Sequence, residues 1–98
     1  MKKKAANKER IVKLIKMLAS ENDPKRLERI LSDLCSPSEM EAMADRYFVL
    51  PMIAAGMPYR QIHAESQVSI TTIGRVARHW HDGHGGYAAL VDKIKEAQ

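Results

Sequence analysis

Residues 59–81 read YRQIHAESQVSITTIGRVARHWH, and this stretch decides the fold. Ser69 is a natural N-cap, because its hydroxyl can accept one of the backbone N–H groups that lack a partner where a helix begins. Ile73, Val76 and Trp80 then follow at helical spacing, which predicts one buried helix face. The stretch therefore predicts two helices joined by a tight turn, a helix-turn-helix over residues 59–81.

The second helix of this pair has short, hydroxyl-bearing or cationic side chains outside its apolar stripe. Such side chains contact base edges and phosphates in DNA-binding proteins. They are Ile70, Thr71, Thr72, Gly74, Arg75 and Arg78. Arg75 and Arg78 lie about one helical turn apart, so both can reach the same DNA strand. The alternative for the arginines is a solvated helix face, and for the threonines the ordinary chemistry of a helix start.

The basic excess of the chain lies in its N-terminal residues and, locally, in residues 59–81, and not in the rest of the chain. Residues 1–16 contain seven Lys/Arg and one acid, a charge of +6, within a chain of formal net charge +4. Residues 17–98 contain nine Lys/Arg and eleven Asp/Glu, a charge of −2. Within residues 59–81 three arginines face a single glutamate, Glu65. A basic face on a near-neutral body suits DNA binding, although it is also common on other soluble proteins.

Apolar residues recur at helical spacing in three segments before the helix pair, which predicts helices beginning at Asn7, Pro24 and Pro37. Their expected buried faces are Ile11, Leu14, Ile15 and Leu18; Leu27, Ile30, Leu31 and Leu34; and Met40, Met43, Ala44, Tyr47, Leu50 and Ala54. Residues 1–6 are expected to form a flexible basic tail, with a phosphate-contacting arm as the alternative. A last helix is expected over residues 87–96. The sequence thus predicts a single all-helical domain of six helices, residues 1–98.

Helix boundaries are marked clearly in the middle of the chain. Ser36 and Glu39 flank Pro37 with the spacing of a capping box, in which each side chain bonds the other residue's backbone N–H. Pro51 falls inside the following helix and predicts a kink. Gly56 is expected to end that helix in a left-handed conformation.

Several classes of protein are excluded by what the sequence lacks. A single cysteine, Cys35, rules out an intrachain disulfide and favours a reducing, cytoplasmic location. No apolar run approaches the roughly 20 residues of a membrane helix, and no signal peptide precedes the first helix. The group His79, His81, Asp82 and His84 lacks ligand spacing on one helix face, so no metal is expected. No catalytic triad, carboxylate pair or phosphate loop occurs, so we expect neither an enzyme nor a cofactor.

Three segments resemble the Trp repressor family, most closely its TrpR-like YerC/YecD branch. They are LCSPSEMEAMADRYFVLPMIAAG at residues 34–56, YRQI at residues 59–62 and SITTIGR at residues 69–75, and the resemblance extends over residues 34–98. It implies an intertwined, all-helical homodimer. It also implies a transcriptional regulator, expected to be a repressor, whose helix-turn-helix binds a double-stranded DNA operator.

The resemblance also implies roles for individual residues. His63 stands where the family repressor presents a DNA-facing lysine, and Ser36 matches a hydroxyl residue of the ligand pocket. Arg46 and Arg75 match the two arginines that flank the tryptophan corepressor. The candidate DNA-binding residues are Arg60, His63, Ser69, Ile70, Thr71, Thr72, Gly74, Arg75 and Arg78. The candidate ligand-binding residues are Ser36, Arg46, Arg75 and His79; for Arg46 an ion pair with Glu41 or Glu39 is the alternative.

Two residues depart from the tryptophan-binding pattern. Val76 stands where the family has a glycine beside the indole, and His79 where a serine meets the ligand amine. The turn around Gly56 is also one residue shorter. We therefore expect a regulator that does not use tryptophan. Two alternatives stay open: a repressor that depends on tryptophan or another small ligand, and a dimeric protein-interaction module without DNA binding, which the −2 charge of residues 17–98 favours.

Overall fold

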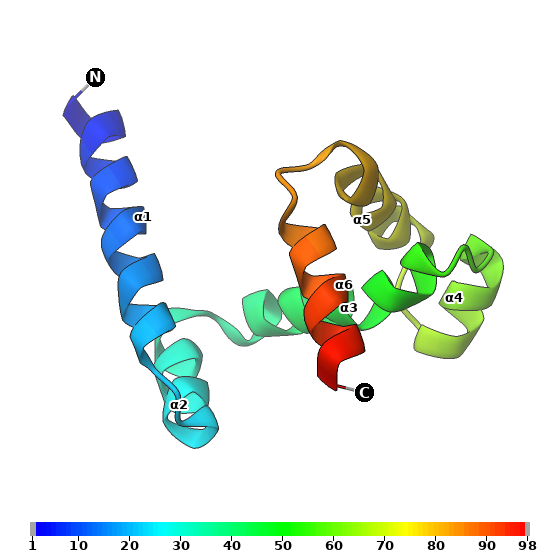
Figure 1. Ribbon diagram of the computed structural model, residues 1–98, viewed down its shortest axis with the longest axis horizontal. Helices are drawn as coiled ribbons and strands as arrows, with labels where there is room; N and C mark the ends of the chain where they lie inside the picture. The colour runs from blue at the N-terminus through cyan, green and yellow to red at the C-terminus, as the bar shows by residue number, and fades with distance from the viewer. Residues whose placement is uncertain (1, 98) are drawn as a thin grey trace. The chain divides into compact units, whose positions relative to one another are not determined.

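The computed structural model describes residues 2–97 and contains six α-helices in that range (Figure 1). They are α1 (Lys2–Ser20), α2 (Pro24–Leu34), α3 (Pro37–Ala54), α4 (Tyr59–Ser66), α5 (Ile70–Asp82) and α6 (Gly86–Ala97). The described residues contain no strand, so the predicted all-helical fold class is confirmed. The chain divides into two compact units, an N-terminal unit (Met1–Met40) and a C-terminal unit (Glu41–Gln98).

The first helix is longer than its apolar pattern predicts. It begins at Lys2 and not at Asn7, so the flexible tail expected over residues 1–6 is wrong for residues 2–6. Met1 lies outside the described residues. Lysine and alanine are good helix formers, so the helix extends through a segment that has no apolar face to bury.

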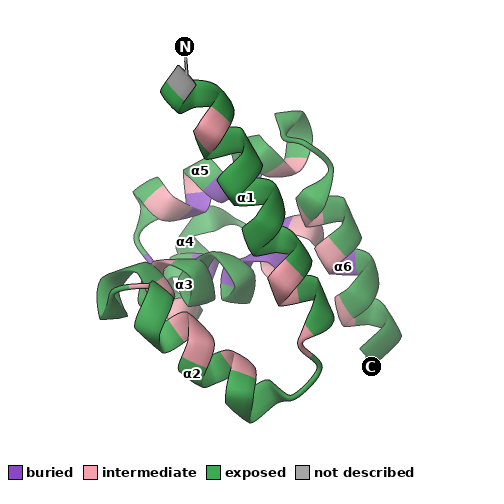
Figure 2. Cartoon of the chain, turned by 90° about the vertical axis from the view of Figure 1, so that its left-hand side faces the viewer, coloured by how far each residue is buried: buried purple, intermediate pink, exposed green. Residues whose placement is uncertain are grey.

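The N-terminal unit has no buried residue among residues 3–40, which corrects the expected buried faces of α1 and α2 (Figure 2). In α1, Ile11 and Ile15 remain 55% and 57% exposed. The two expected faces are covered only in part: Leu18, Leu27, Ile30 and Leu31 are half-buried, and the other members are exposed. The start of α2 is nevertheless well fixed, because the Lys25 N–H donates to Asp23 Oδ1 at 3.3 Å and Pro24 follows the cap.

The predicted capping box at the start of α3 is confirmed. The Ser36 N–H donates to Glu39 Oε1 at 2.7 Å, and the Glu39 N–H donates to Ser36 Oγ at 3.1 Å. The bond from the Ser36 N–H also lowers the pKa of the Glu39 carboxyl, since it favours the ionised form. Two of the backbone groups left free at a helix start are thereby satisfied.

Further along, the burial of α3 matches the expected face only in part: Leu50 was predicted to be buried, but Val49 and Ile53 were not. Its buried residues are Val49, Leu50 and Ile53, whereas Met43 and Tyr47 are exposed. The periodicity misleads here because α3 is apolar on several sides, so spacing alone does not select one face. The helix continues through Pro51, and the chain leaves it at Gly56, whose φ of +80° confirms the left-handed end.

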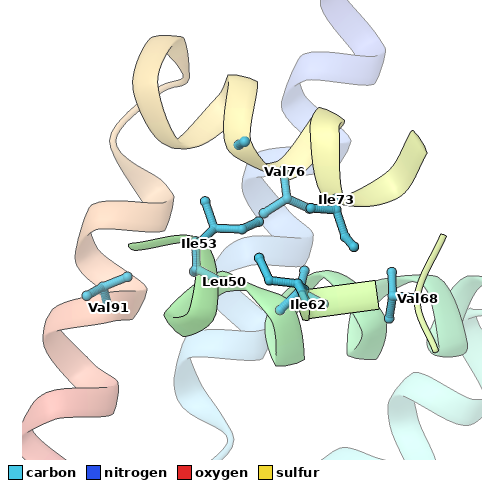
Figure 3. Packing of buried hydrophobic residues seen from close by; sticks show 9 residues of the cluster. Leu50, Ile53, Ile62, Val68, Ile73, Val76 and Val91 are labelled. Carbon is cyan, nitrogen blue, oxygen red and sulfur yellow. The ribbon is translucent and has the colours of Figure 1, made fainter. Parts of the chain in front are cut away.

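The C-terminal unit encloses one small core, to which α3, α4, α5 and α6 all contribute (Figure 3). Its buried members are Val49, Leu50, Ile53, Ile62, Val68, Ile73, Val76, Ala77 and Val91. The main helix packing joins α5 to α4 and to α6. Within the predicted stripe Ile73 and Val76 are buried, and Trp80 packs against the cluster while partly exposed. Each fully buried Ile, Leu or Val contributes about 1.5–3 kcal/mol, so these few residues hold α5 in place.

Candidate nucleic-acid interface

Helices α4 and α5 are joined by the short turn at residues 67–69. Gln67 adopts a left-handed conformation at φ +65°, which costs roughly 1–2 kcal/mol for a residue other than glycine. Hydrogen bonds hold it there: the Gln67 N–H donates to the His63 carbonyl at 2.9 Å, and the Val68 N–H donates to Ser66 Oγ at 3.1 Å. Val68 is itself 5% exposed and anchors the turn in the core. The angle between the two helices is therefore fixed by packing and by hydrogen bonds.

Ser69 caps α5 as the sequence predicts. The Thr72 N–H donates to Ser69 Oγ at 3.1 Å, and the Ser69 hydroxyl lies 3.0 Å from Thr72 Oγ1. Thr72 is half-buried and engaged in the cap, so helix-start chemistry accounts for it. Thr71 is exposed, with no such bond among the described residues. The two threonines are therefore not equivalent, and Thr71 is the one that faces solvent.

The outward face of α5 combines cations with an exposed apolar residue. Arg75 and Arg78 are exposed, and Ile70 is 45% exposed. On α4, Arg60 is exposed as well. Within residues 2–97 the one ion pair joins Arg26 to Glu21, so no acid of the described chain neutralises these three arginines. The described residues therefore leave the positive charge of these arginines unpaired.

His63 has a structural task in addition to its exposed position. Its Nδ1 lies 2.7 Å from the Val68 carbonyl oxygen. A carbonyl only accepts, so this bond requires the proton on Nδ1 and leaves Nε2 as the free ring nitrogen. The side chain therefore ties α4 to the turn, a role that the sequence pattern did not indicate.

Three of the four candidate ligand-binding residues come together in the C-terminal unit. Arg46, Arg75 and His79 line an open hollow of about 260 Å³ together with Val76 and Tyr87. The fourth candidate belongs to the N-terminal unit, where its hydroxyl takes part in the capping box. The ion pair considered for Arg46 is absent from the described residues. The hollow is consequently lined by two guanidinium groups, one aliphatic side chain and two aromatic rings.

Tyr87 is the residue of this hollow that the sequence did not indicate. Its ring meets that of His79 edge to face, with centroids 6.5 Å apart and an interplanar angle of 74°. His79 also donates from Nδ1 to the Arg75 carbonyl at 2.9 Å, one turn back along α5. In the sequence Tyr87 has only the spacing of an ordinary packing residue of α6, so nothing marked its place.

A second open hollow of about 150 Å³ lies beside the first. It is lined by His79, Gly83, His84, Gly86 and Tyr87. Over residues 2–97, no three His, Cys, Asp or Glu side chains come close enough to hold a metal ion. In the same range no helix is both long enough and apolar enough to cross a membrane.

Relatives of known sequence agree with the resemblance seen in the motifs. Residues 9–95 match the Trp repressor protein family. The chain is also 32% identical over 85 residues to the uncharacterized protein YerC of Bacillus subtilis (strain 168), covering 87% of this chain and 82% of that protein. No solved structure matches the chain.

Proposed function

Because the chain belongs to the Trp repressor family, whose members are DNA-binding regulators and not enzymes, we propose that it is a homodimeric repressor that binds its operator without tryptophan. The outward face of α5 carries this proposal. Ile70 and Thr71 are exposed at the start of that helix, and Arg75 follows about one turn later. Apolar and hydroxyl groups suit thymine methyls and base acceptors, whereas arginine suits phosphates and guanine.

The other candidate DNA-binding residues form two groups, those proposed to contact DNA and those that hold α5 in position. Arg60 and Arg78 are exposed cations and are proposed to bind phosphates. Ser69, Thr72 and His63 hold the start of α5 and the turn through the hydrogen bonds described above. We propose that these three residues orient α5. The free Nε2 of His63 can contact DNA in addition.

Unpaired apolar surface supports the homodimer. Large apolar residues are exposed on three helices of the chain: Ile11, Val12, Leu14, Ile15, Leu34, Met43, Tyr47 and Phe48. Ile11, Leu14 and Ile15 lie on one face of α1, and a contiguous exposed apolar patch of this kind marks an interaction site. A second copy would cover them with an equal and self-complementary surface, as two-fold symmetry requires.

Two residues support independence from tryptophan. Val76 brings a branched side chain to the wall of the 260 Å³ hollow, and its neighbour His79 is occupied by the Arg75 carbonyl and the Tyr87 ring. Neither residue offers the small, hydroxyl-bearing surroundings that the family motif associates with the corepressor.

DNA binding can be tested on sites selected from random duplexes. We expect Arg75→Ala to weaken binding about tenfold or more, and the logarithm of affinity to fall linearly with the logarithm of salt concentration. Arg29→Ala, an exposed arginine of α2, is the matched control and should lose less. Binding that ignored both the substitution and the salt would contradict the proposal.

The two guanidinium groups of the hollow favour a second candidate, a repressor controlled by another small anionic ligand. Calorimetry with tryptophan and related metabolites separates the candidates. Saturable binding that disappears in Arg46→Ala would favour ligand control, and no binding would favour independence.

Retention on a heparin column distinguishes the proposed DNA-binding regulator from a protein-interaction module without DNA binding. Retention that vanishes when residues 1–8 are removed would favour the module, because α5 would then contribute no binding of its own.

A further inference from the structure

Gly74 lies inside α5, where glycine is a poor choice. It is the fifth residue of a helix that runs from Ile70 to Asp82. Glycine in a helix interior destabilises the helix relative to alanine, because it loses more backbone freedom on folding. A glycine at this position therefore needs a reason.

The fold of the described residues gives no reason for a glycine at position 74. Gly74 is not among the residues with positive φ, so its backbone conformation suits any L-residue. A Cβ added there would meet nothing within 4 Å, so no neighbouring helix requires the space. The other glycines differ: Gly56 and Gly85 have positive φ, and a Cβ on Gly83 would lie 2.3 Å from the His79 carbonyl oxygen.

The position of Gly74 shows where the empty space opens. It lies one turn after Ile70 and one turn before Arg78, on the same side of α5. Both neighbours are exposed, and Thr71 borders the same space. The missing side chain therefore leaves a notch in the outward face, flanked by an apolar group, a hydroxyl and a cation.

Such a notch is useful to a partner that approaches the helix backbone itself. The charge of this face selects a polyanion, since its arginines have no acidic partner in the described chain. An α-helix fits the major groove of double-stranded DNA, in which base edges project toward the helix.

We propose that Gly74 lets the backbone of α5 come close to the floor of the major groove, so that the notch receives a base edge and Gly74 helps to set the operator sequence. This inference rests on the proposed DNA-binding function. It makes Gly74 a specificity-determining residue through the absence of a side chain.

The test is Gly74→Ala, for which stability and DNA binding should change in opposite directions. The melting temperature should rise by about 4–8 °C, because alanine favours the helix and has room. Affinity for the wild-type operator should fall about tenfold or more, the usual loss from one wrong contact at a base pair. A new selection from random DNA should change the preferred base at the pair or pairs that face the notch and leave the other positions unchanged.

Gly86→Ala is the matched control. Gly86 is the first residue of α6, its φ is not positive, and an added Cβ would also meet nothing within 4 Å. It should keep the wild-type affinity and base preference.

Four other results would contradict either the inference about Gly74 or the proposed function. An unchanged affinity and base preference in Gly74→Ala would overturn the inference while leaving the proposed function intact. A lower melting temperature would also overturn it, since the side chain would then collide within the fold. A change of oligomeric state in sedimentation would overturn it by placing a second copy at the notch. A wild-type protein that selects no DNA would instead contradict the proposed function.

Discussion

Replacing Ile15 by alanine tests whether a second copy covers the apolar face of α1. In the single chain Ile15 is 57% exposed, so less than half of its surface is buried. Complete burial of such a side chain contributes about 1.5–3 kcal/mol, and the single chain would therefore lose only about 1 kcal/mol on truncation. If a second copy covers α1, the same change leaves a cavity and costs about 2–5 kcal/mol per chain.

Urea unfolding at two protein concentrations a hundredfold apart measures both effects. Unfolding of an obligate dimer separates the chains, so the hundredfold dilution lowers the apparent free energy of unfolding by about 2.7 kcal/mol per dimer. Ile62→Ala is the control, because Ile62 is fully buried in the C-terminal unit and should lose about 2–5 kcal/mol whether or not chains associate. Unfolding that is independent of concentration, together with a loss near 1 kcal/mol for Ile15→Ala, would refute the dimer.

Two further predictions concern the helix caps. Ser69→Ala should lower the free energy of unfolding in urea by about 1 kcal/mol, because the cap is lost. Ser69→Asp should keep the cap and the stability but weaken DNA binding, because it adds a negative charge to the face of α5. Equal destabilisation by both changes would contradict this assignment. The pKa of Glu39 is lowered on folding by the Ser36 N–H, so its contribution to stability is present above the unfolded value and is lost as pH falls through the lower, folded value. Unfolding measured from about pH 6 down to about pH 3 should therefore lose stability more steeply in the wild type than in Glu39→Gln; parallel pH profiles would argue against the capping carboxylate.

Local chemistry explains what the sequence predicted correctly. Ser36 and Ser69 identify helix starts because a cap needs only a hydroxyl and the next few backbone N–H groups. Ile73 and Val76 identify the buried face of α5 because that helix is polar on its other side. Gly56 marks the end of α3 for an equally local reason, its left-handed backbone.

The errors arose where burial depends on distant parts of the chain. Spacing alone predicted the burial of Leu50 correctly but also placed Met43 and Tyr47 on the buried face of α3, although both are exposed. Tyr87 joins the hollow only because α6 packs against α5, a tertiary contact without a local motif. The helical start of α1 was missed because chain termini are usually poorly ordered, although lysine and alanine favour helix. The candidate DNA contacts and the single-domain organisation remain predictions.

The lack of any buried residue in residues 3–40 also affects how the protein is made. A ribosome delivers these residues before Val49 to Val91, which span the core of the C-terminal unit. The nascent chain thus displays the apolar side of α1 while it has nothing of its own to bury it against. In a homodimer that exposure ends only when another chain arrives, so neighbouring ribosomes on one messenger supply the nearest partner. In a homodimer, the yield of folded protein would then depend on the concentration of chains as well as on the stability of the core.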